Sequence, residues 1–130
     1  MKFAKLVFRI AGVWGIVLLV PLYFMFDLIG AQDPPPITHP GFYYGFVGVA
    51  LAWQIAFFII ARDPARFRPM MIPSIVEKIG YGGAMTVLYL QGRQHGQDLV
   101  FGIIDLLFAA LFAAAYVRTR QTAAMSVIGH

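Results

Sequence analysis

The acidic residue Asp105 is the side chain with the clearest potential for chemistry in this sequence. It lies inside an uninterrupted apolar run, residues 99–117, six positions from the start of that run. A carboxyl group within an apolar helix is costly to bury in a membrane and often marks a proton or ligand site. A structural role is the alternative, in which Asp105 joins helices through a hydrogen bond to Tyr89 or Gln54. The sequence leaves both roles open.

Further polar residues flank the apolar runs on the side that we place outside the membrane. An outward-facing ligand or proton pocket would be formed by Asp105, Asp27, Tyr89 and His39. Three separate segments also contribute possible metal ligands: Asp27, Asp33, His39, His95 and Asp98. None of them has a spacing such as HxxxH or HExxH, so we predict no metal site and no cofactor.

A second candidate cluster lies between the second and third apolar runs. Glu77 is a candidate ion-pair partner for Arg62, Arg66 or Arg68, and such a pair would latch this loop to the helices. Ser74 and Glu77 also match the S-x-x-E capping box, which predicts that the third helix begins there. The neighbouring Lys78 is expected to extend its ammonium group to water at the membrane surface.

The composition excludes an ordinary soluble enzyme. The 130 residues are 60% hydrophobic and 12% charged, and the mean hydropathy is +0.75, whereas soluble domains average about 45 to 50% apolar and 25% charged residues. Cysteine is absent, which excludes disulfides, thiol nucleophiles and cysteine-ligated metals. The ten basic residues are scattered between apolar blocks, so a nucleic-acid partner is not expected.

The apolar residues fall into four runs that are each long enough to cross a bilayer. They are residues 10–26, 42–61, 75–91 and 99–117. Continuous apolar runs predict helices, because membrane barrels need alternating segments. The predicted fold class is therefore all-α, a single antiparallel bundle of four transmembrane helices that covers residues 1–130.

Basic residues predict the orientation of this bundle. Eight lie near the span ends on one side: Lys2, Lys5, Arg9, Arg62, Arg66, Arg68, Arg118 and Arg120. The other side has Arg93 alone, so the positive-inside rule places both termini in the cytoplasm. The first run could instead be a cleaved signal peptide, but its 17 apolar residues exceed the usual length of about 7 to 15.

Loops and small residues complete the predicted layout. Pro34, Pro35 and Pro36 favour an extended connection after the first span, and Asp63-Pro64 favours a short interfacial helix before the third. Small residues at four-residue spacing predict close helix packing or a homo-oligomer interface. They are Gly48, Ala52 and Ala56, Gly80 and Ala84, Ala109 and Ala113, and Ala110 and Ala114.

A resemblance to other proteins covers the second and third spans. It is carried by Trp53-Gln54, by the run ARDPARFRPMM from Ala61 to Met71, and by Glu77-Lys78. In these residues the chain resembles a group of small, uncharacterised bacterial four-helix membrane proteins. The resemblance implies a bacterial inner-membrane location and a four-span layout, and it implies no activity for any residue.

Three functional hypotheses follow. The first is a non-enzymatic structural, regulatory or accessory membrane component, alone, as a homo-oligomer or with a membrane protein partner. The second is a small-ligand or lipid-binding protein, or an isomerase-like enzyme, with an outward-facing pocket at Asp105. The third is a proton-coupled small transporter that acts as a dimer, in which Asp105 changes its access between the two sides.

Overall fold

The computed structural model describes residues 2–32, 35–94 and 96–128, with side chains described up to Arg120. Every regular element in these ranges is helical, which confirms the predicted all-α class. In chain order the elements are α1 (Lys2–Leu19), the 3-10 turn η1 (Val20–Phe24), α2 (Phe26–Gln32), α3 (Pro40–Arg62), the 3-10 turn η2 (Arg68–Met70), α4 (Met71–Leu90) and α5 (Gly96–Ile128).

Three of the four long helices are apolar enough to cross a membrane. The qualifying segments are Lys2–Phe24, Pro40–Arg62 and Gly96–Arg120, and α4 is not among them. The charged pair Glu77-Lys78 lies within α4 and lowers its hydropathy. The structure therefore supports a membrane protein with three candidate membrane-spanning helices.

Prolines and a glycine determine several helix ends. At Pro21 the chain changes from α1 into η1, because proline has no N–H to donate to the preceding turn. At the end of α4, Gly92 has a φ of +72°, its N–H donates to the carbonyl of Tyr89, and the N–H of Arg93 donates to the carbonyl of Leu88. These two bonds form a Schellman motif, which ends a helix at a left-handed glycine.

The start of α4 differs from the prediction. The helix begins at Met71, and Ser74 lies inside it, where the hydroxyl donates to the carbonyl of Met70 at 2.7 Å. No side chain caps this helix start, so the capping box of Ser74 and Glu77 was wrong. The reason is that Pro73 fits into a first helical turn, where its missing N–H has no partner in any case.

The predicted interfacial helix is reduced to turns. Asp63 accepts the N–H of Arg66 on its side chain at 3.3 Å and that of Phe67 on its carbonyl at 3.0 Å, as a cap would. Residues 64–67 then form a turn that leads directly into η2. Pro69 cannot donate a backbone hydrogen bond, so the segment does not continue as an α-helix.

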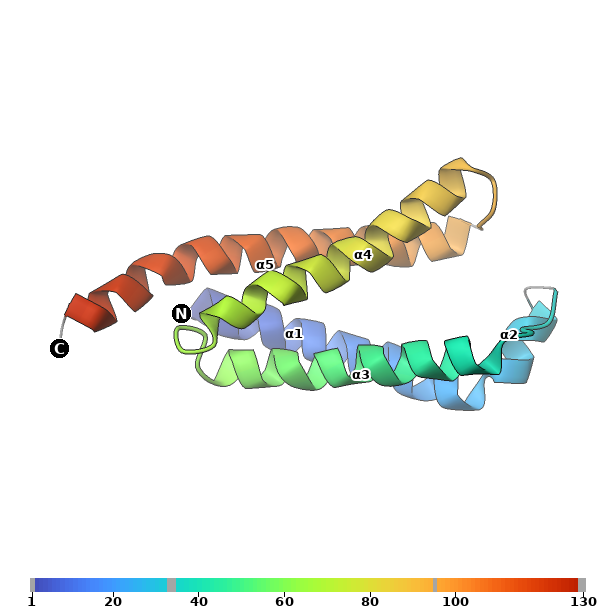
Figure 1. Ribbon diagram of the computed structural model, residues 1–130, viewed down its shortest axis with the longest axis horizontal. Coiled ribbons are helices and arrows are strands. Elements are labelled where there is room, and N and C mark those ends of the chain that lie inside the picture. The colour runs from blue at the N-terminus through green and yellow to red at the C-terminus, as the bar shows by residue number, and fades with distance from the viewer. Residues whose placement is uncertain (1, 33–34, 95, 129–130) are drawn as a thin grey trace.

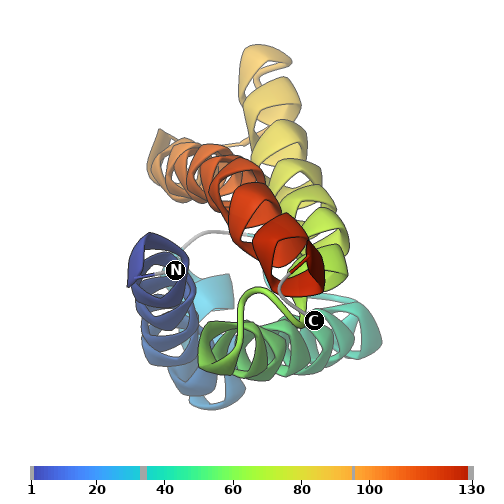
Figure 2. The same ribbon diagram turned by 90° about the vertical axis from the view of Figure 1, so that its left-hand side faces the viewer.

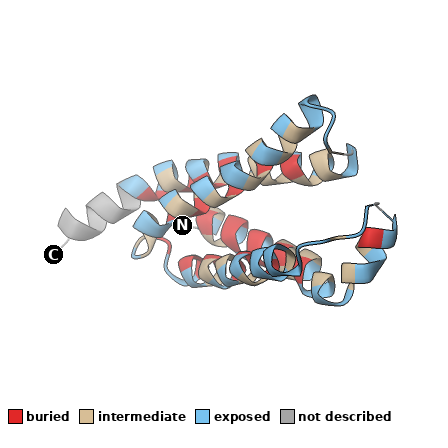
Figure 3. Cartoon of the chain, turned by 45° about the vertical axis from the view of Figure 1, so that its right-hand side comes forward, coloured by how far each residue is buried: buried red, intermediate tan, exposed pale blue. Residues whose placement is uncertain are grey.

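The four long helices form two pairs, with α1 along α3 and α4 along α5 (Figures 1 and 2). Contacts between α1 and α5 join the pairs. The pairs lie close together at the end of the molecule that carries η2, and they diverge toward the end that carries α2 (Figures 1 and 3). The fold is thus a bundle that is closed at one end.

The core lies at this closed end. The Phe8 ring stacks on the Phe112 ring with 4.2 Å between centroids, and Phe57 meets Phe112 edge-on at 5.0 Å. All three rings are fully buried, as is Met71 beside them. Because these residues come from α1, α3, α4 and α5, this aromatic cluster holds all four helices together.

Glycines set the closest helix approaches. A side chain at Gly82 would meet the carbonyl oxygen of Gly102 at 2.7 Å, and a side chain at Gly15 would overlap Gln54. By contrast Gly80, which the sequence placed on a packing stripe with Ala84, is exposed. Close packing of α4 therefore uses Gly82 rather than the predicted stripe, because Gly82 is on the face that meets α5.

Candidate functional site

The most polar buried contact joins α4 to α5. The Lys78 ammonium lies 3.4 Å from Oδ1 of Asp105, and the two side chains are 4% and 14% exposed. Aromatic rings flank the ammonium, with the Phe57 centroid at 5.3 Å and the Phe108 centroid at 5.5 Å. A cation over a ring face gains electrostatic attraction, especially where water is excluded.

This contact corrects two predictions from the sequence. Lys78 turns inward and is 3% exposed as a whole residue, so it does not extend to water. The hydrogen-bond partner of Asp105 is Lys78 rather than Tyr89 or Gln54. An ammonium in an apolar surrounding needs a counter-charge, and Asp105 is the nearer of the two carboxylates within its reach.

Helix register brings the two charges together. Buried residues of α4 recur at Met71, Ser74, Lys78 and Gly82, the spacing of a single helix face. Gly82 touches Gly102 of α5, and the two helices are joined by a short loop, so residues before Gly82 meet residues after Gly102. Lys78 precedes one glycine by four positions and Asp105 follows the other by three, which places them in contact.

A second carboxylate completes a charge cluster of three residues, Glu77, Lys78 and Asp105. Oε2 of Glu77 lies 3.9 Å from the Lys78 ammonium, and the Glu77 side chain is 20% exposed. This oxygen is buried and has no hydrogen-bond partner. With both carboxyl groups ionised the cluster has a net charge of −1, and burial makes that charge costly. Chemically, the cluster can hold a proton or tie helices together.

The loop arginines act on a different partner from the predicted one. In the described part of the chain the ion-pair partner of Glu77 is Lys78. Arg68 instead lies 3.6 Å above the Tyr116 ring and donates from Nε to the Tyr116 carbonyl at 2.9 Å. Arg66 lies 5.4 Å from the Phe67 ring, and Arg62 is exposed. A latch between the loop and α5 therefore exists, and Arg68 forms it.

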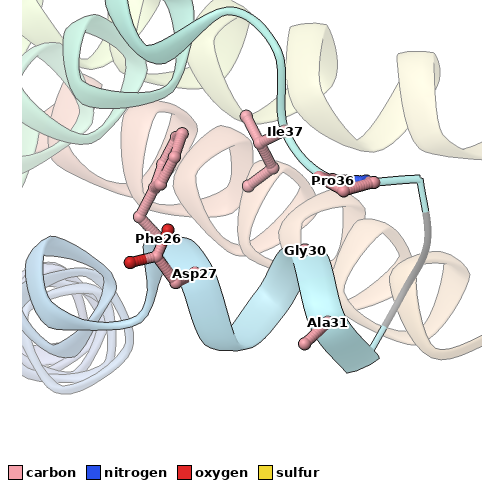
Figure 4. Close-up of a pocket in the computed structure, with 6 residues that line it drawn as sticks. All are labelled: Phe26, Asp27, Gly30, Ala31, Pro36 and Ile37. Carbon is pink, nitrogen blue, oxygen red and sulfur yellow. The ribbon is translucent and has the colours of Figure 1, made fainter.

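Of the four outward-facing candidates, Asp105 belongs to this cluster, and Asp27, His39 and Tyr89 lie elsewhere in the fold. Asp27 lines a pocket of about 190 Å³ together with Phe26, Gly30, Ala31, Pro36 and Ile37 (Figure 4). His39 precedes α3 and meets Phe42 edge-on at 5.7 Å, and Tyr89 is exposed near the end of α4. None of Asp105, Tyr89 and His39 lines the pocket at Asp27.

Two of the possible metal ligands, Asp33 and His95, lie outside the described residues. Among the described residues, His, Asp and Glu side chains form no group of three that could hold a metal ion. Gln54, predicted to bond across helices, donates to the carbonyl of Ala50 on its own helix at 2.8 Å. Its Oε1 is buried against Gly15 without a hydrogen-bond partner.

No known sequence pattern could have identified the whole cluster, but one signal pointed to the ion pair. Lys78 and Asp105 are nearly equidistant from the turn at Gly92, and helices that fold back on one another bring such positions together. Comparison with known proteins adds nothing to this geometry: no protein-family profile, curated protein or solved structure matches the chain.

Proposed function

We propose that this protein is a four-span integral membrane protein of a bacterial inner membrane with both termini in the cytoplasm. Its eight basic residues near span ends, against Arg93 alone on the other side, support this orientation. A cluster of stacked and edge-on aromatic rings supports the placement of the other end of the bundle at the outer membrane–water interface, because tyrosine is enriched at such interfaces. It is formed by Tyr23, Phe26, Tyr43 and Tyr44, and Tyr43 donates to the carbonyl of Leu22 at 2.6 Å.

The ion pair also supports α4 as the fourth span. A helix with an unpaired lysine and an unpaired glutamate inside the membrane would insert poorly. Pairing of Lys78 with Asp105 at 3.4 Å removes much of that cost once α4 packs against α5. The layout is that of the small bacterial membrane proteins that the segment from Trp53 to Lys78 resembles.

The role proposed for the protein is non-enzymatic, as a structural, regulatory or accessory component of the membrane. The observation that carries this proposal is the packing of Lys78 and Asp105 between helices, with the ammonium flanked by the Phe57 and Phe108 rings. These groups hold α4 to α5. This packing supports a structural role for Asp105, the strongest candidate for chemistry in the sequence.

Proteoliposomes with an internal pH-sensitive dye test this role. We expect wild-type protein to pass protons no faster than empty vesicles when a pH gradient is imposed. The paired variant Lys78→Leu with Asp105→Leu should still insert and fold, because it removes both partners of the buried pair. Proton flux that exceeds the empty control and disappears in the paired variant would contradict the proposal.

A proton-coupled transporter is the second candidate, and Glu77 is the observation that favours it. Its Oε2 is buried, has no hydrogen-bond partner and lies 3.9 Å from a lysine that also pairs with Asp105, so it is a group that could take up a proton. The same flux assay separates the candidates: a transporter predicts flux that Glu77→Gln abolishes, whereas an accessory protein predicts no flux in either form. The exposed Asp63→Asn in the cytoplasmic loop is the matched control.

A further inference from the structure

One face of α1 combines a basic end with an apolar groove. The groove has a volume of about 380 Å³ and is lined by Arg9, Ile10, Val13, Trp14 and Val17. Its three aliphatic residues are 50 to 62% exposed, so no other part of the described chain covers them. Arg9 is the only charged residue in the lining.

The basic residues of α1 are grouped near this groove. Lys5 precedes Arg9 by four residues, which places them next to one another on a helix surface. Lys2 lies on the same side, one further turn back, and both Lys2 and Arg9 are exposed. No acidic residue occurs in α1. The end of the groove is therefore positively charged and lacks a counter-charge on its own helix.

We propose that this face of α1 binds an anionic phospholipid. The phosphate group lies at Arg9 and Lys5, and one acyl chain runs along Ile10, Val13 and Val17 toward the membrane centre. The eight helical steps from Arg9 to Val17 span about 12 Å of helix, close to the hydrocarbon depth of a single leaflet, about 15 Å. A basic group above an apolar surface therefore matches both parts of a lipid molecule at the right separation.

The inference rests on the proposed membrane location. The charge of the lipid headgroup then decides which lipid the basic residues of α1 prefer. A zwitterionic lipid offers the same phosphate but also carries a positive group that the basic residues repel. An anionic headgroup has no such group, and each lysine or arginine near the surface favours it about fivefold. Preference for anionic lipid is thus the property to measure.

The groove contains its own reporter, because Trp14 lines it. The chain has one other tryptophan, Trp53, which packs beside Phe57 in the core with 6.4 Å between rings. Trp53→Phe keeps an aromatic ring there and leaves Trp14 as the sole tryptophan. Its fluorescence is then measured in vesicles that contain equal mole fractions of acyl-brominated phosphatidylglycerol or acyl-brominated phosphatidylcholine, since bromine quenches tryptophan on contact.

We expect the brominated phosphatidylglycerol to bind at Trp14 several-fold more strongly than the brominated phosphatidylcholine. Arg9→Gln should reduce this preference about fivefold, and Arg9→Lys should retain it. The control is Arg120→Gln, which removes the same charge from an exposed site on α5 and should leave the preference unchanged. An equal loss in Arg9→Gln and Arg120→Gln would overturn the proposal, because the effect would then be one of overall surface charge.

Two further outcomes distinguish this inference from the membrane location. Equal quenching by the two lipids would overturn the phospholipid site and leave the membrane location intact. Absence of quenching by either lipid, with Trp14 fluorescence like that of protein in water, would overturn the membrane location and the site with it.

Discussion

Lys78 of α4 places its ammonium 3.4 Å from the Asp105 carboxylate of α5, one helical turn from the point where Gly82 touches Gly102. The glycine contact and the ion pair depend on each other. Without side chains at the glycines the two backbones approach closely, and that approach brings the charged side chains within reach. The pair then offsets the cost of two buried charges.

Removal of one partner should be more harmful than removal of both. Asp105→Asn removes the nearer carboxylate and leaves the Lys78 ammonium with Glu77 alone, at 3.9 Å, so we expect a loss of about 1 to 3 kcal/mol in the free energy of unfolding. The paired variant Lys78→Leu with Asp105→Leu should lose less than Asp105→Asn, since apolar replacement of a buried pair is often neutral or stabilising and the Glu77 side chain, which loses its ion-pair partner, is 20% exposed. Denaturant unfolding in detergent micelles measures all three proteins.

A double-mutant cycle, which adds the single variants Lys78→Leu and Asp105→Leu to the wild type and the paired variant, gives the coupling between Lys78 and Asp105. A stable Asp105→Asn variant with no coupling would contradict the ion pair as a stabilising contact. Such a result would favour a hydrogen bond of Asp105 to a neutral group, which an asparagine can replace.

The contact between Gly82 and Gly102 predicts a sharp difference between neighbouring positions. A methyl group at Gly82 would lie 2.6 Å from Cγ of Leu106, whereas one at Gly83 would meet nothing within 4 Å. We expect Gly82→Ala to lower the free energy of unfolding by about 1 to 3 kcal/mol through overpacking. Gly83→Ala should be neutral or slightly stabilising, because alanine favours helix. Equal effects at the two positions in thermal unfolding would exclude the close approach.

The latch between the loop and α5 predicts that Arg68 matters more than its neighbours. Arg68→Ala removes the stacking on Tyr116 at 3.6 Å and the hydrogen bond to its carbonyl. We expect a loss of about 1 to 3 kcal/mol from these two contacts and faster proteolysis between residues 62 and 70. Arg66→Ala is the control, because Arg66 is exposed and lies farther from its ring, at 5.4 Å. An unchanged rate of proteolysis in Arg68→Ala would contradict the conclusion that Arg68 holds the loop to α5.

The membrane crossing of α4 can be tested with single cysteines, since the chain has none of its own. Met70→Cys and Gln97→Cys introduce exposed thiols at the two ends of the α4 segment. We expect an impermeant thiol reagent to label Gln97→Cys in intact cells and Met70→Cys only after permeabilisation. Thr38→Cys, exposed in the loop before α3, should be labelled like Gln97→Cys. Labelling of Met70 and Gln97 on the same side would show that α4 does not cross.

The sequence by itself determined the class of this protein. Apolar runs of 17 to 20 residues with little charge predict helices wherever they fall, because backbone groups in an apolar surrounding must bond within their own segment. The structure places long helices over the last three predicted runs and over residues 10–19 of the first, which then continues as the 3-10 turn η1. Errors at the helix ends came from local competition, as at Ser74, where Pro73 permits an earlier start than the capping box predicts.

Only the tertiary structure decided which residues meet. Hydropathy places Lys78 and Asp105 within apolar runs of the sequence. Contact between them depends on the rotation and register of α4 against α5. The close approach of Gly82 to Gly102 sets that register. The same holds for Asp27, which lies in a pocket of its own segment, because the two helix pairs diverge toward that end (Figure 3). The sequence shows which residues share one face of a helix. Which face of another helix they pack against depends on how the two helix surfaces fit together, and so the side-chain partners were decided by the tertiary structure.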